Sequence, residues 1–432
     1  MPLVDQRVPL GDQRVPQGDA LAIAAPAVAR TPAVAVPPAA PVAGAAAVPA
    51  AVVVGREIVL FRPADDRAAA WLAGTEAAPL DPPVDLVAPP FCRPTLEVNG
   101  MRIALEPGTR AVLGTDGAGG PQLEVVFGAA VIAGPGRLGI VAGELAGAIT
   151  TGPAAPVGVE VTLWRPPGAG ADATQRVARI MPTAGRIDWQ PAESAAGDRG
   201  IAAGQVLEWR SATAGEPLVV AAGPPPAWLT GSGVAAAGER RAADALANAL
   251  ASGCAAVPAL EELAGHRRVE NRVAAAAALA MIGELDDLVR LLVADGPAAL
   301  PESLWDRLDA VAVQPTLARG DRAADAFDAA VAAHAPAGAA DAVTRFARGT
   351  GDEELAAGAP ADLIAALESP HLVVRRYALR NLFEVAGPAP GDRLRYRADR
   401  APEELREGAA WWRAQFEQGR IRRAATEGAT DR

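Results

Sequence analysis

The sequence of 432 residues contains no lysine, so all 40 of its basic residues are arginine. Aromatic residues are also scarce, at 4% of the chain, although half of all residues are hydrophobic. The missing lysine accompanies an excess of Ala, Gly and Pro, which indicates the coding bias of a GC-rich genome and carries no information about mechanism. With so few aromatic rings, any core must be packed mainly from Ala and Val side chains.

Cysteine and histidine are nearly absent, which limits the chemistry that the chain can perform. His266, His334 and His371 lie in separate segments with no Cys or second His close by, so the spacing of a zinc site is not met. Cys92 and Cys254 are far apart and are compatible with one disulfide or with two free thiols, so they do not decide the compartment. We expect no metal ion and no small-molecule cofactor.

Negative charge exceeds positive charge along most of the chain, and the net charge is −11. Residues 1–90 hold 6 Arg and 9 acidic residues, residues 91–230 hold 10 and 12, and residues 231–432 hold 24 and 30. Only residues 371–432 have more Arg than acidic residues, 13 against 9, and basic residues near helix ends usually complement the helix dipole. We therefore expect no nucleic-acid partner.

The first 55 residues have the composition of an extended, solvated linker, because a chain rich in Ala and Pro without aromatic rings cannot bury enough surface to fold. Residues 31–54 lack charge, but five prolines interrupt them, which argues against a transmembrane helix. No signal peptide is visible, and the repeat of DQRVP at 5–9 and 12–16 resembles a start inside a longer reading frame. We predict that residues 1–55 are disordered and that any membrane anchor lies upstream.

The segment LEVNGMRIALEPGTRAVLG, residues 96–114, predicts a β-hairpin. Asn99 and Gly100 tolerate positive φ and suit a two-residue type I′ turn, which sets the register of the strands on either side. That register separates apolar pairs on one face from a charged pair on the other. The predicted pairs are Val98 with Met101, Leu96 with Ile103, and Glu97 with Arg102.

Strand-like runs continue as far as residue 223 and are separated by turns rich in Pro and Gly. In the run 157–164 apolar residues occupy alternate positions, which is the period of a strand with one buried face. Helical spacing is absent from this region. The sequence predicts a β-rich domain over residues 56–223, with strands within 123–134, 157–164, 176–189, 200–209 and 217–223.

The hydrophobic pattern becomes helical after the triple proline at 224–226. Leu285, Leu288, Val289 and Leu292 follow the i, i+3, i+4, i+7 spacing of an amphipathic helix. The segments predicted from this change are a hinge over residues 224–238, an α-helical array over 239–420 and a disordered tail over 421–432.

Two helical segments resemble each other in detail. RVAAAAALAMIG at 272–283 and RYALRNLFEVAG at 376–387 both carry an Arg, an Ala two residues later and a closing Gly. Each is expected to be the inner helix of a helical pair, and Ser369 with Pro370 predicts the start of the second, as N-cap and first helical residue. The separation of 104 residues fits two or three imperfect units of an α-solenoid.

The β-region, at about residues 91–215, resembles the extracytoplasmic domain of FecR-type regulators. The resemblance rests on GMRIALEPGTRAVLG, on LEVVFGAAVI, which looks like the strand with the family's recurring Gly-small pair, and on IMPTAGRIDW and GIAAGQVLEW, which look like its closing Gly-containing strands. The helical half is similar to HEAT-like repeats. FecR-like domains sense or relay an envelope signal to a membrane partner, and HEAT-like arrays bind other proteins, so both resemblances imply binding rather than catalysis.

Motifs for catalysis are weak throughout the chain. TGSGV at 230–234 lacks the G-x-S-x-G arrangement of a nucleophile elbow, and the glycine-rich loop at 114–120 leads into a strand rather than into the N-terminus of a helix. Adjacent carboxylates such as Glu261 and Glu262 point about 100° apart on a helix and cannot share one site.

One enzyme hypothesis remains, a glycan- or peptide-directed hydrolase built on the β-domain. It would use Asp188 and Glu208, which lie beside Trp189 and Trp209 in the sequence. Neighbouring acids and aromatic residues are common in carbohydrate sites, but they equally suit alternating strands with one wet face, which is the interpretation that we favour.

Trp411 and Trp412 are the most distinctive local feature of the helical half. Leu405, Ala409, Trp412 and Phe416 share one face of a helix, so Trp412 is expected in the core. Trp411 is turned about a quarter-circle away and is the candidate partner-binding residue, although a core or capping role is the favoured alternative.

The sequence therefore predicts a multidomain protein, β then α, with a disordered Ala/Pro-rich linker, a FecR-like β-domain and a HEAT-like α-solenoid. We expect a non-enzymatic cell-envelope protein, in signalling or as a scaffold, that binds a protein partner through its helical array; a membrane regulator is one candidate. The hydrolase and a purely structural scaffold are the alternatives. The expected location is extracytoplasmic or periplasmic, with an anchor outside this chain, and a cytoplasmic location is the alternative.

Overall fold

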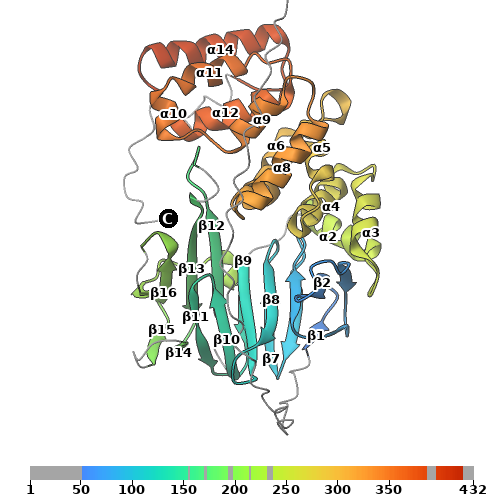
Figure 1. The fold of residues 1–432 in the computed structure, drawn as a ribbon, viewed down its shortest axis with the longest axis vertical. Coiled ribbons are helices and arrows are strands. Elements are labelled where there is room, and N and C mark those ends of the chain that lie inside the picture. Colours follow the sequence, from blue (N-terminus) through green and yellow to red (C-terminus); the bar gives the residue numbers. More distant parts are fainter. Residues whose placement is uncertain are drawn as a thin grey trace, which may run out of the picture. The chain divides into compact units, whose positions relative to one another are not determined.

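The computed structural model describes residues 51–421, apart from 154–155, 170–172, 193–197, 214–215, 231–236 and 387–395. Strands occupy the chain from Ala51 to Ala221, and helices follow from Ala227 to Glu417 (Figure 1). The predicted order, a β-rich region followed by a helical region, is confirmed.

Seventeen strands are present in the described residues, and their pairings fall into two groups that share one long strand. The strands are β1 (Ala51–Val54), β2 (Val59–Pro63), β3 (Leu72–Gly74), β4 (Pro79–Leu80), β5 (Val84–Val87), β6 (Thr95–Val98), β7 (Met101–Leu105), β8 (Arg110–Thr115), β9 (Pro121–Ala133), β10 (Gly136–Ala142), β11 (Leu145–Thr151), β12 (Val157–Trp164), β13 (Gln175–Pro182), β14 (Arg186–Pro191), β15 (Arg199–Ala202), β16 (Gln205–Arg210) and β17 (Leu218–Ala221). One group has the order β4-β1-β6-β7-β9-β12-β13-β16-β17. The other has the order β3-β2-β5-β8-β9-β10-β11-β14-β15, in which only the contact of β9 with β10 is parallel.

The two groups of strands share one hydrophobic core, as the two sheets of a sandwich do. Leu96 from the first group and Leu86 from the second belong to the same buried cluster. Alternating apolar residues give each strand one face toward this cluster. In β12 the predicted alternation is confirmed, because Val157, Val159 and Val161 are all buried in it.

The strand β9 passes from one group to the other at Gly128. Its first half pairs with β8, and its second half, from Gly128 onward, pairs with β12. Gly128 has a φ of +94°, and a Cβ atom at this position would lie 2.5 Å from Oγ1 of Thr109, so only glycine fits. The Thr109 hydroxyl donates to the carbonyl of Ala129 and accepts from its N–H, both at 2.9 Å.

The hairpin of β6 and β7 has the predicted register. Asn99 and Gly100 have φ angles of +50° and +79°, which are the positive values that a type I′ turn requires. Apolar residues of the hairpin are buried and its charged pair is exposed. The observed pairs are Val98 with Met101, Leu96 with Ile103, and Glu97 with Arg102.

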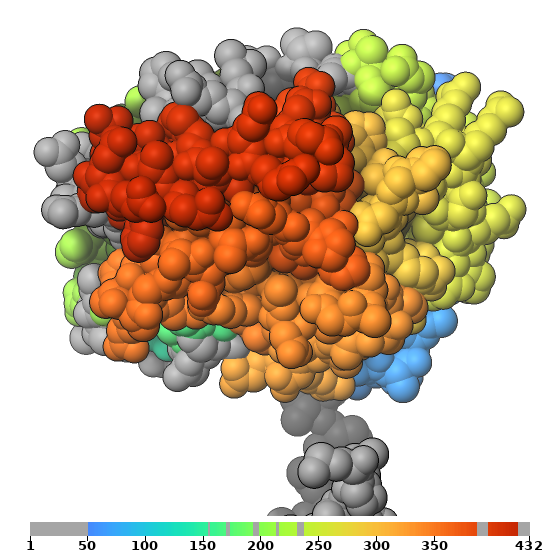
Figure 2. Space-filling model, turned by 90° about the horizontal axis from the view of Figure 1, so that it is seen from above, coloured from blue at the N-terminus to red at the C-terminus, as the bar shows by residue number. Residues whose placement is uncertain are grey.

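The helical region contains long and short helices that surround a second core. Its helices are α1 (Ala227–Thr230), α2 (Ala237–Ala249), α3 (Ala256–Ala264), α4 (Val269–Ile282), α5 (Asp286–Val293), α6 (Glu302–Leu308), a π-helix (Asp309–Val313), α7 (Gln314–Leu317), α8 (Asp321–His334), α9 (Ala340–Ala347), α10 (Asp352–Ala356), α11 (Ala359–Ala366), α12 (Leu372–Ala386) and α14 (Pro402–Glu417). In Figure 2 the segments after residue 300, coloured orange to red, form most of the visible face.

The two segments that resemble each other in sequence are both helical. The first is α4, which ends at Gly283 with a φ of +105°, as its closing glycine predicts. The second is α12, but it begins at Leu372 rather than at Pro370, so the predicted N-cap is wrong. The Ser369 hydroxyl instead accepts a hydrogen bond from the N–H of His371 at 3.2 Å, in a turn before the helix. The closing glycine of the second segment, Gly387, lies outside the described residues.

The alanine-rich helix α4 contacts two hydrophobic clusters at once. Ala276 and Ala280 belong to the core of the helical region. Ala274 and Ala278 belong to a separate cluster that also contains Leu60 of β2. Because an alanine side chain ends at Cβ, neighbours on both sides can approach the helix closely. The strands and the first helices are therefore joined by a common core.

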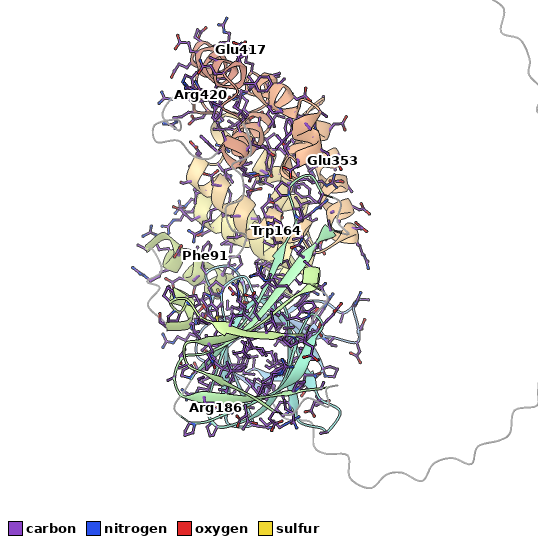
Figure 3. All side chains as sticks on the ribbon, turned by 90° about the vertical axis from the view of Figure 1, so that its left-hand side faces the viewer. Phe91, Trp164, Arg186, Glu353, Glu417 and Arg420 are labelled. Atoms are coloured by element: carbon purple, nitrogen blue, oxygen red, sulfur yellow. The ribbon has the colours of Figure 1, made fainter. Side chains whose placement is uncertain are left out.

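A second contact between strands and helices lies after β12. The N–H of Gly168 donates to the carbonyl of Arg348, which follows α9, at 3.1 Å. Trp164 ends β12 on this side of the molecule and is half exposed, whereas Arg186 lies at the opposite end of the strands (Figure 3). The strands therefore also meet the helices at the end of β12.

The segments predicted as linker, hinge and tail are described only in part. Residues 51–54 form β1 and pair with β4 and β6, while residues 1–50 lie outside the described residues. The segment 224–238 contains α1, whose Leu229 packs against Met181 and Val206, and residues 231–236 are not described. The tail is described only at Ile421, which is buried in the helical core.

Candidate functional site

A groove runs along one face of α12. Two cavities, of about 510 and 540 Å³, adjoin at Arg376 and Asp399, which line both. Together they extend from Leu372 to Glu384, and these twelve helical steps correspond to about 18 Å at 1.5 Å per residue. We call this feature the α12 groove. Its walls are α12, α6 with the π-helix, and the residues around Asp399.

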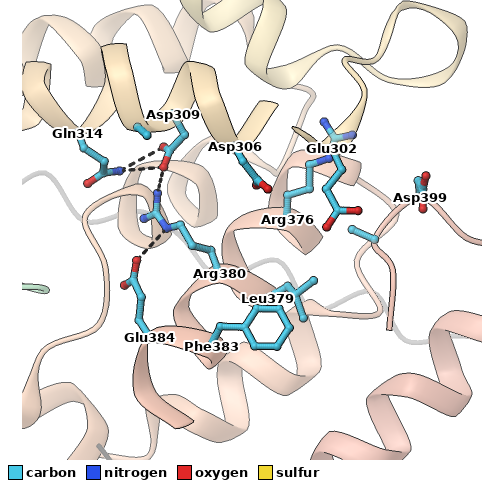
Figure 4. Close-up of a pocket in the computed structure, with 12 residues that line it drawn as sticks. Glu302, Asp306, Asp309, Gln314, Arg376, Leu379, Arg380, Phe383, Glu384 and Asp399 are labelled. Atoms are coloured by element: carbon cyan, nitrogen blue, oxygen red, sulfur yellow. Dashed lines mark hydrogen bonds and ion pairs between the residues drawn. The ribbon is translucent and has the colours of Figure 1, made fainter. Parts of the chain in front are cut away.

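The spacing of residues on α12 explains why they share the groove. Arg376, Leu379, Arg380, Phe383 and Glu384 follow the spacing i, i+3, i+4, i+7 and i+8, which places them on one helical face (Figure 4). The other faces of α12 supply buried apolar residues to the core. One helix therefore anchors itself in the core and presents charged and apolar groups to the groove.

The opposite wall is built in the same way from α6 and the π-helix. Glu302, Asp306, Asp309 and Ala310 follow the spacing i, i+4, i+7 and i+8 and line the same cavity. Glu302, Asp306 and Ala310 are exposed, whereas Asp309 is buried. This wall thus carries carboxylates both at the opening of the groove and at its base.

Asp309 holds the base of the groove together. Its carboxylate accepts hydrogen bonds from Gln314 Nε2 at 3.1 Å and from Arg380 Nη1 (Figure 4). It also accepts one from Tyr377 Oη at 3.2 Å. Burial alone would lower the pKa of Arg380, but the charges of Asp309, Glu384 and Tyr377, together with the hydrogen bond to Asp309, outweigh it, and the pKa of Arg380 is raised. Burial, together with Asp309, raises the pKa of Tyr377 well above its usual value. Arg380 therefore stays charged and the Tyr377 phenol stays neutral at ordinary pH.

The π-helix places Asp309 in this position. The N–H of Gln314 donates to the carbonyl of Asp309, five residues earlier, which is the hydrogen bond of a π-turn. Pro315 has no N–H to continue the regular α-helical pattern, so an irregular turn at this point costs less than it would elsewhere. Turns of this type are frequent at functional sites.

Arg376 lies where the two cavities meet and is only 6% exposed. Its Nη2 donates to the carbonyl of Leu300 at 2.5 Å, and its guanidinium lies 5.6 Å from the centroid of the Trp305 ring. Among the described residues no carboxylate comes within 4.0 Å of it, and burial lowers its pKa. Its remaining N–H groups have no hydrogen-bond partner in the described part of the chain.

Negative charge dominates the lining of the α12 groove. Six carboxylates face three guanidinium groups, which leaves a formal excess of three negative charges. Leu379 and Phe383 add an apolar surface between the charged groups. Asp309 and Glu384 are paired with Arg380, and Asp399 is paired with Arg397, so part of this charge is already compensated.

The two neighbouring tryptophans of α14 have different environments. Trp412 is buried, as predicted, and its ring packs edge to face on Phe383 with centroids 5.7 Å apart. Leu405 and Ala409 are buried as well, whereas Phe416, near the end of the same helical face, is 37% exposed. Trp411 is half buried, packs edge to face on Trp412 at 5.1 Å and does not line the α12 groove. Its binding role stays a prediction.

The acidic residues of the hydrolase hypothesis lie in different groups of strands. Asp188 is on β14 and pairs with Arg186 at 3.6 Å, whereas Glu208 is on β16 beside a cavity of about 900 Å³. Burial would raise the pKa of Glu208, but hydrogen bonds from Arg179 and Arg210 outweigh it, so its pKa is lowered. A general acid requires the opposite shift.

The aromatic partners of these acids, Trp189 and Trp209, are both buried in the core of the strands. Trp189 has no exposed surface, and Trp209, although it lines the cavity beside Glu208, is only 6% exposed. These residues therefore fit strands with one buried and one solvent-exposed face better than they fit a carbohydrate site.

The histidines and cysteines do not come together. His334 Nε2 lies 3.1 Å from Asp286 Oδ1, and His266 accepts a hydrogen bond from the N–H of Arg268. Cys92 and Cys254 are free thiols, which decides between the two states left open by the sequence. Within the described ranges, no group of three or more His, Cys, Asp or Glu residues has the geometry of a metal site.

Sequence reasoning did not find the α12 groove. The segment RYALRNLFE was predicted as an inner helix, but its Arg376 and Arg380 recur at helical spacing with Phe383 and Glu384, a mixed pattern unlike a purely apolar face. This mixed pattern was the feature of the sequence that could have indicated the groove. The partner wall also follows helical spacing, but that spacing alone does not show which other helix its carboxylates face.

Comparisons with protein-family models, with curated proteins and with solved structures find no match for this chain. None of the described helices is both long enough and apolar enough to cross a membrane.

Proposed function

We propose that this chain is a non-enzymatic cell-envelope protein that binds a protein partner through its helical region. The α12 groove is the main support. Its length of about 18 Å corresponds to five or six residues of an extended peptide, at about 3.3 Å per residue. Grooves between helices, with apolar surface and a few polar groups, are common binding sites.

The sequence resemblances specify this proposal further. A FecR-like β-domain would receive or relay an envelope signal, and a HEAT-like array would hold the partner. The strands and helices share the cluster around α4, which supports a role in which the two regions act together. A membrane regulator is the partner class that fits, with an extracytoplasmic location and an anchor outside this chain. Signalling and scaffolding are two forms of the same proposal.

Trp411 is proposed as a second partner contact, outside the α12 groove. Its ring is half buried and rests on Trp412, so an exposed edge is held in a fixed orientation. Tryptophan rings held in this way are frequent anchors of protein interfaces.

Site-specific photo-cross-linking tests the proposed function. A benzoylphenylalanine is placed at Ala310, which is exposed and lines the α12 groove, and at Ala326, which is exposed on α8, as the matched control. With envelope membranes of the source organism, we expect one protein cross-linked from position 310 and not from position 326.

Two results would contradict the proposed function. One is an equal cross-linking pattern from both positions. The other is release of soluble products from purified peptidoglycan or from a peptide mixture by the purified chain, which would favour the hydrolase. A structural scaffold without a partner predicts no cross-linked protein at either position.

A further inference from the structure

We infer that two copies of this chain associate through the open edge of β17, which pairs antiparallel with the same strand of the second copy. The inference goes beyond the proposed function, because it assigns a partner to the strands rather than to the helical region. It rests on the exposure of β17, on the direction of its backbone groups and on the symmetry of the pairing that these groups allow.

The first step is the exposed apolar surface of β17. Six large hydrophobic residues are exposed in the described part of the chain, and three of them are consecutive on this strand. Leu218, Val219 and Val220 are 65%, 39% and 40% exposed. Side chains of a strand alternate between its two faces, so β17 is uncovered on both. Consecutive exposed apolar residues at the edge of a sheet indicate a place where another chain can pair.

The strands at the other ends of the two groups are protected. β4 carries Pro79, which has no N–H to donate. β3 is covered by the segment before α3, because the N–H of Ala73 donates to the carbonyl of Cys254 at 3.0 Å. β15 begins with Arg199, which is paired with Glu216 at 2.7 Å. Charge, proline and covering segments are the usual protection of an edge, and the sequence LVVA of β17 supplies neither charge nor proline.

The second step is the direction of the backbone groups of β17. In the described part of the chain this strand pairs only with β16, which lies at the left-hand edge of the strands in Figure 1. At the end of the pair, the N–H of Ala222 donates to the carbonyl of Gly204 at 2.8 Å. Hydrogen-bonded and non-hydrogen-bonded positions alternate along antiparallel strands, so positions 218, 220 and 222 face β16. The N–H and C=O groups of Val219 and Ala221 therefore point to the open edge.

The third step is the symmetry of the pairing that these groups allow. When Val219 of each copy lies opposite Ala221 of the other, all the N–H and C=O groups that point outward from these residues find partners. A two-fold axis then passes beside Val220, which lies opposite Val220 of the second copy. A register shifted toward the start of the strand would use Pro217, which has no N–H, and would form fewer hydrogen bonds. The edge of β17 is therefore complementary to itself.

Charge and area fit a weak contact between identical chains. Residues 217–226 contain no charged side chain, so two copies meet without like charges at the contact. Glu208, which is opposite Leu218 on β16, is already paired with Arg179 at 2.9 Å and with Arg210 at 2.6 Å. A strand of four residues offers less than the roughly 800 Å² per partner of a stable interface. The dimer should therefore form reversibly and depend on protein concentration.

Sedimentation velocity of the full chain tests the association. The sedimentation coefficient should rise reversibly toward that of a dimer as the protein concentration increases. Val220→Arg and Val220→Glu each place two like charges together at the two-fold axis, so each variant alone should stay monomeric. An equimolar mixture of the two should associate again, because opposite charges then meet. Phe416→Glu, which changes an exposed residue of α14, is the matched control and should dimerise as the unchanged chain does.

Disulfide cross-linking tests the register, in a Cys254→Ser background that removes the half-buried native thiol. Val220→Cys should give covalent dimers with a mild oxidant, because Cα atoms of opposite non-hydrogen-bonded residues lie about 4.5 Å apart. Val219→Cys, which is equally exposed, is the matched control. Its two Cα atoms would be diagonal neighbours about 7–8 Å apart, too far for a disulfide without backbone movement, so it should give at least tenfold less dimer.

The inference is overturned if the chain stays monomeric at the highest concentration, if the mixed charge variants do not associate, or if both cysteine variants cross-link equally. Loss of the dimer in Phe416→Glu would assign the contact to another surface and overturn it as well. A monomeric chain that captures a strand of a foreign protein at β17 has the same consequence. None of these results affects the proposed function, which is read from cross-linking at position 310.

Discussion

Asp309 is the residue on which the base of the α12 groove depends. Its carboxylate accepts hydrogen bonds from Tyr377, Gln314 and Arg380. Within the described residues, Arg380 forms ion pairs with Asp309 and with the exposed Glu384. A buried ion pair adds little net stability, but removing one member leaves the other charge uncompensated. Replacing one member of the ion pair should therefore lower the stability of the fold, and replacing Asp309 and Arg380 together should lower it less.

We predict that Asp309→Ala lowers the free energy of unfolding by about 3–5 kcal/mol, because it leaves the largely buried Arg380 guanidinium with only the exposed carboxylate of Glu384 as a counter-charge. The double variant with Arg380→Met should recover much of this loss. Urea unfolding of the two single variants and the double variant gives the coupling energy. Strictly additive losses would show that the two side chains do not depend on each other.

A second prediction separates the two tryptophans of α14. Trp412→Ala should cost about 3–5 kcal/mol, because the ring is buried and supports Phe383. Trp411→Ala should cost about 1 kcal/mol, because its ring is half buried, and should weaken partner capture if the ring is an interface anchor. Thermal melting and cross-linking from position 310 are measured for both. Equal losses of stability would assign both rings to the core.

The two thiols should differ in reactivity. Burial, with a smaller effect from Glu57, raises the pKa of Cys92 to about 12, so at pH 8 it stays protonated and shielded. Cys254 is half buried. We predict that a disulfide reagent at pH 8 labels one thiol of the native chain, and that Cys254→Ser abolishes this reaction while Cys92→Ser does not.

The same pKa shift implies a dependence of stability on pH. In the unfolded chain the Cys92 thiol ionises near pH 9, whereas in the folded chain it ionises near pH 12. Stability should therefore fall as the pH rises from about 9 to about 12, and Cys92→Ser should reduce this fall. A wild-type curve that is flat over this range would contradict the assignment.

Among the elements, β9 is the one whose path depends on a single glycine. We predict that Gly128→Ala destabilises the chain by at least about 1–3 kcal/mol, because positive φ is unfavourable for alanine and its Cβ would collide with Thr109. Gly100→Ala is the matched control, since its φ is also positive but nothing lies within 4 Å of the added Cβ. Similar losses in both variants would show that the close approach to Thr109 adds nothing.

The local elements differ in how well sequence reasoning predicts them. The hairpin of β6 and β7 was predicted to the residue, because Asn99 and Gly100 fix both the turn and the register. Amphipathic helices such as α5 were also found, since their spacing decides their buried face. The start of α12 was missed, because a serine before a proline can cap a helix or close a turn, and the choice depends on neighbours that sequence does not show.

The candidate site was harder to predict than the elements that build it. Asp306 and Gln314 have a spacing that is compatible with one helical face, but the spacing does not show which other helix that face meets. Arg380 and Asp309 are 71 residues apart in the sequence, and no local pattern indicates their pairing. Contacts of this kind depend on how helices pack, which the hydrophobic pattern of one chain determines only in outline.

At the scale of the whole molecule, the cluster around α4 joins strands and helices. The sequence predicts that the regions on either side of residues 224–238 fold independently, whereas the buried contacts of Leu60 with the first helices favour mutual dependence. We predict that helicity and the burial of the sandwich tryptophans are lost in a single urea transition. Two separate transitions, with stable fragments after cleavage near 224–238, would support independent folding instead.

The position of α4 between the strands and the other helices makes its alanine content important for packing. The abundance of alanine in this chain follows from coding bias, but in α4 the alanines are fully buried between two hydrophobic clusters, where a larger side chain would have to displace its neighbours. A scan of all substitutions should find alanine almost irreplaceable at positions 274–278 and freely exchanged in the exposed turns of other helices. Along α4, alanine therefore has a structural role in packing that it does not have in the exposed parts of the chain.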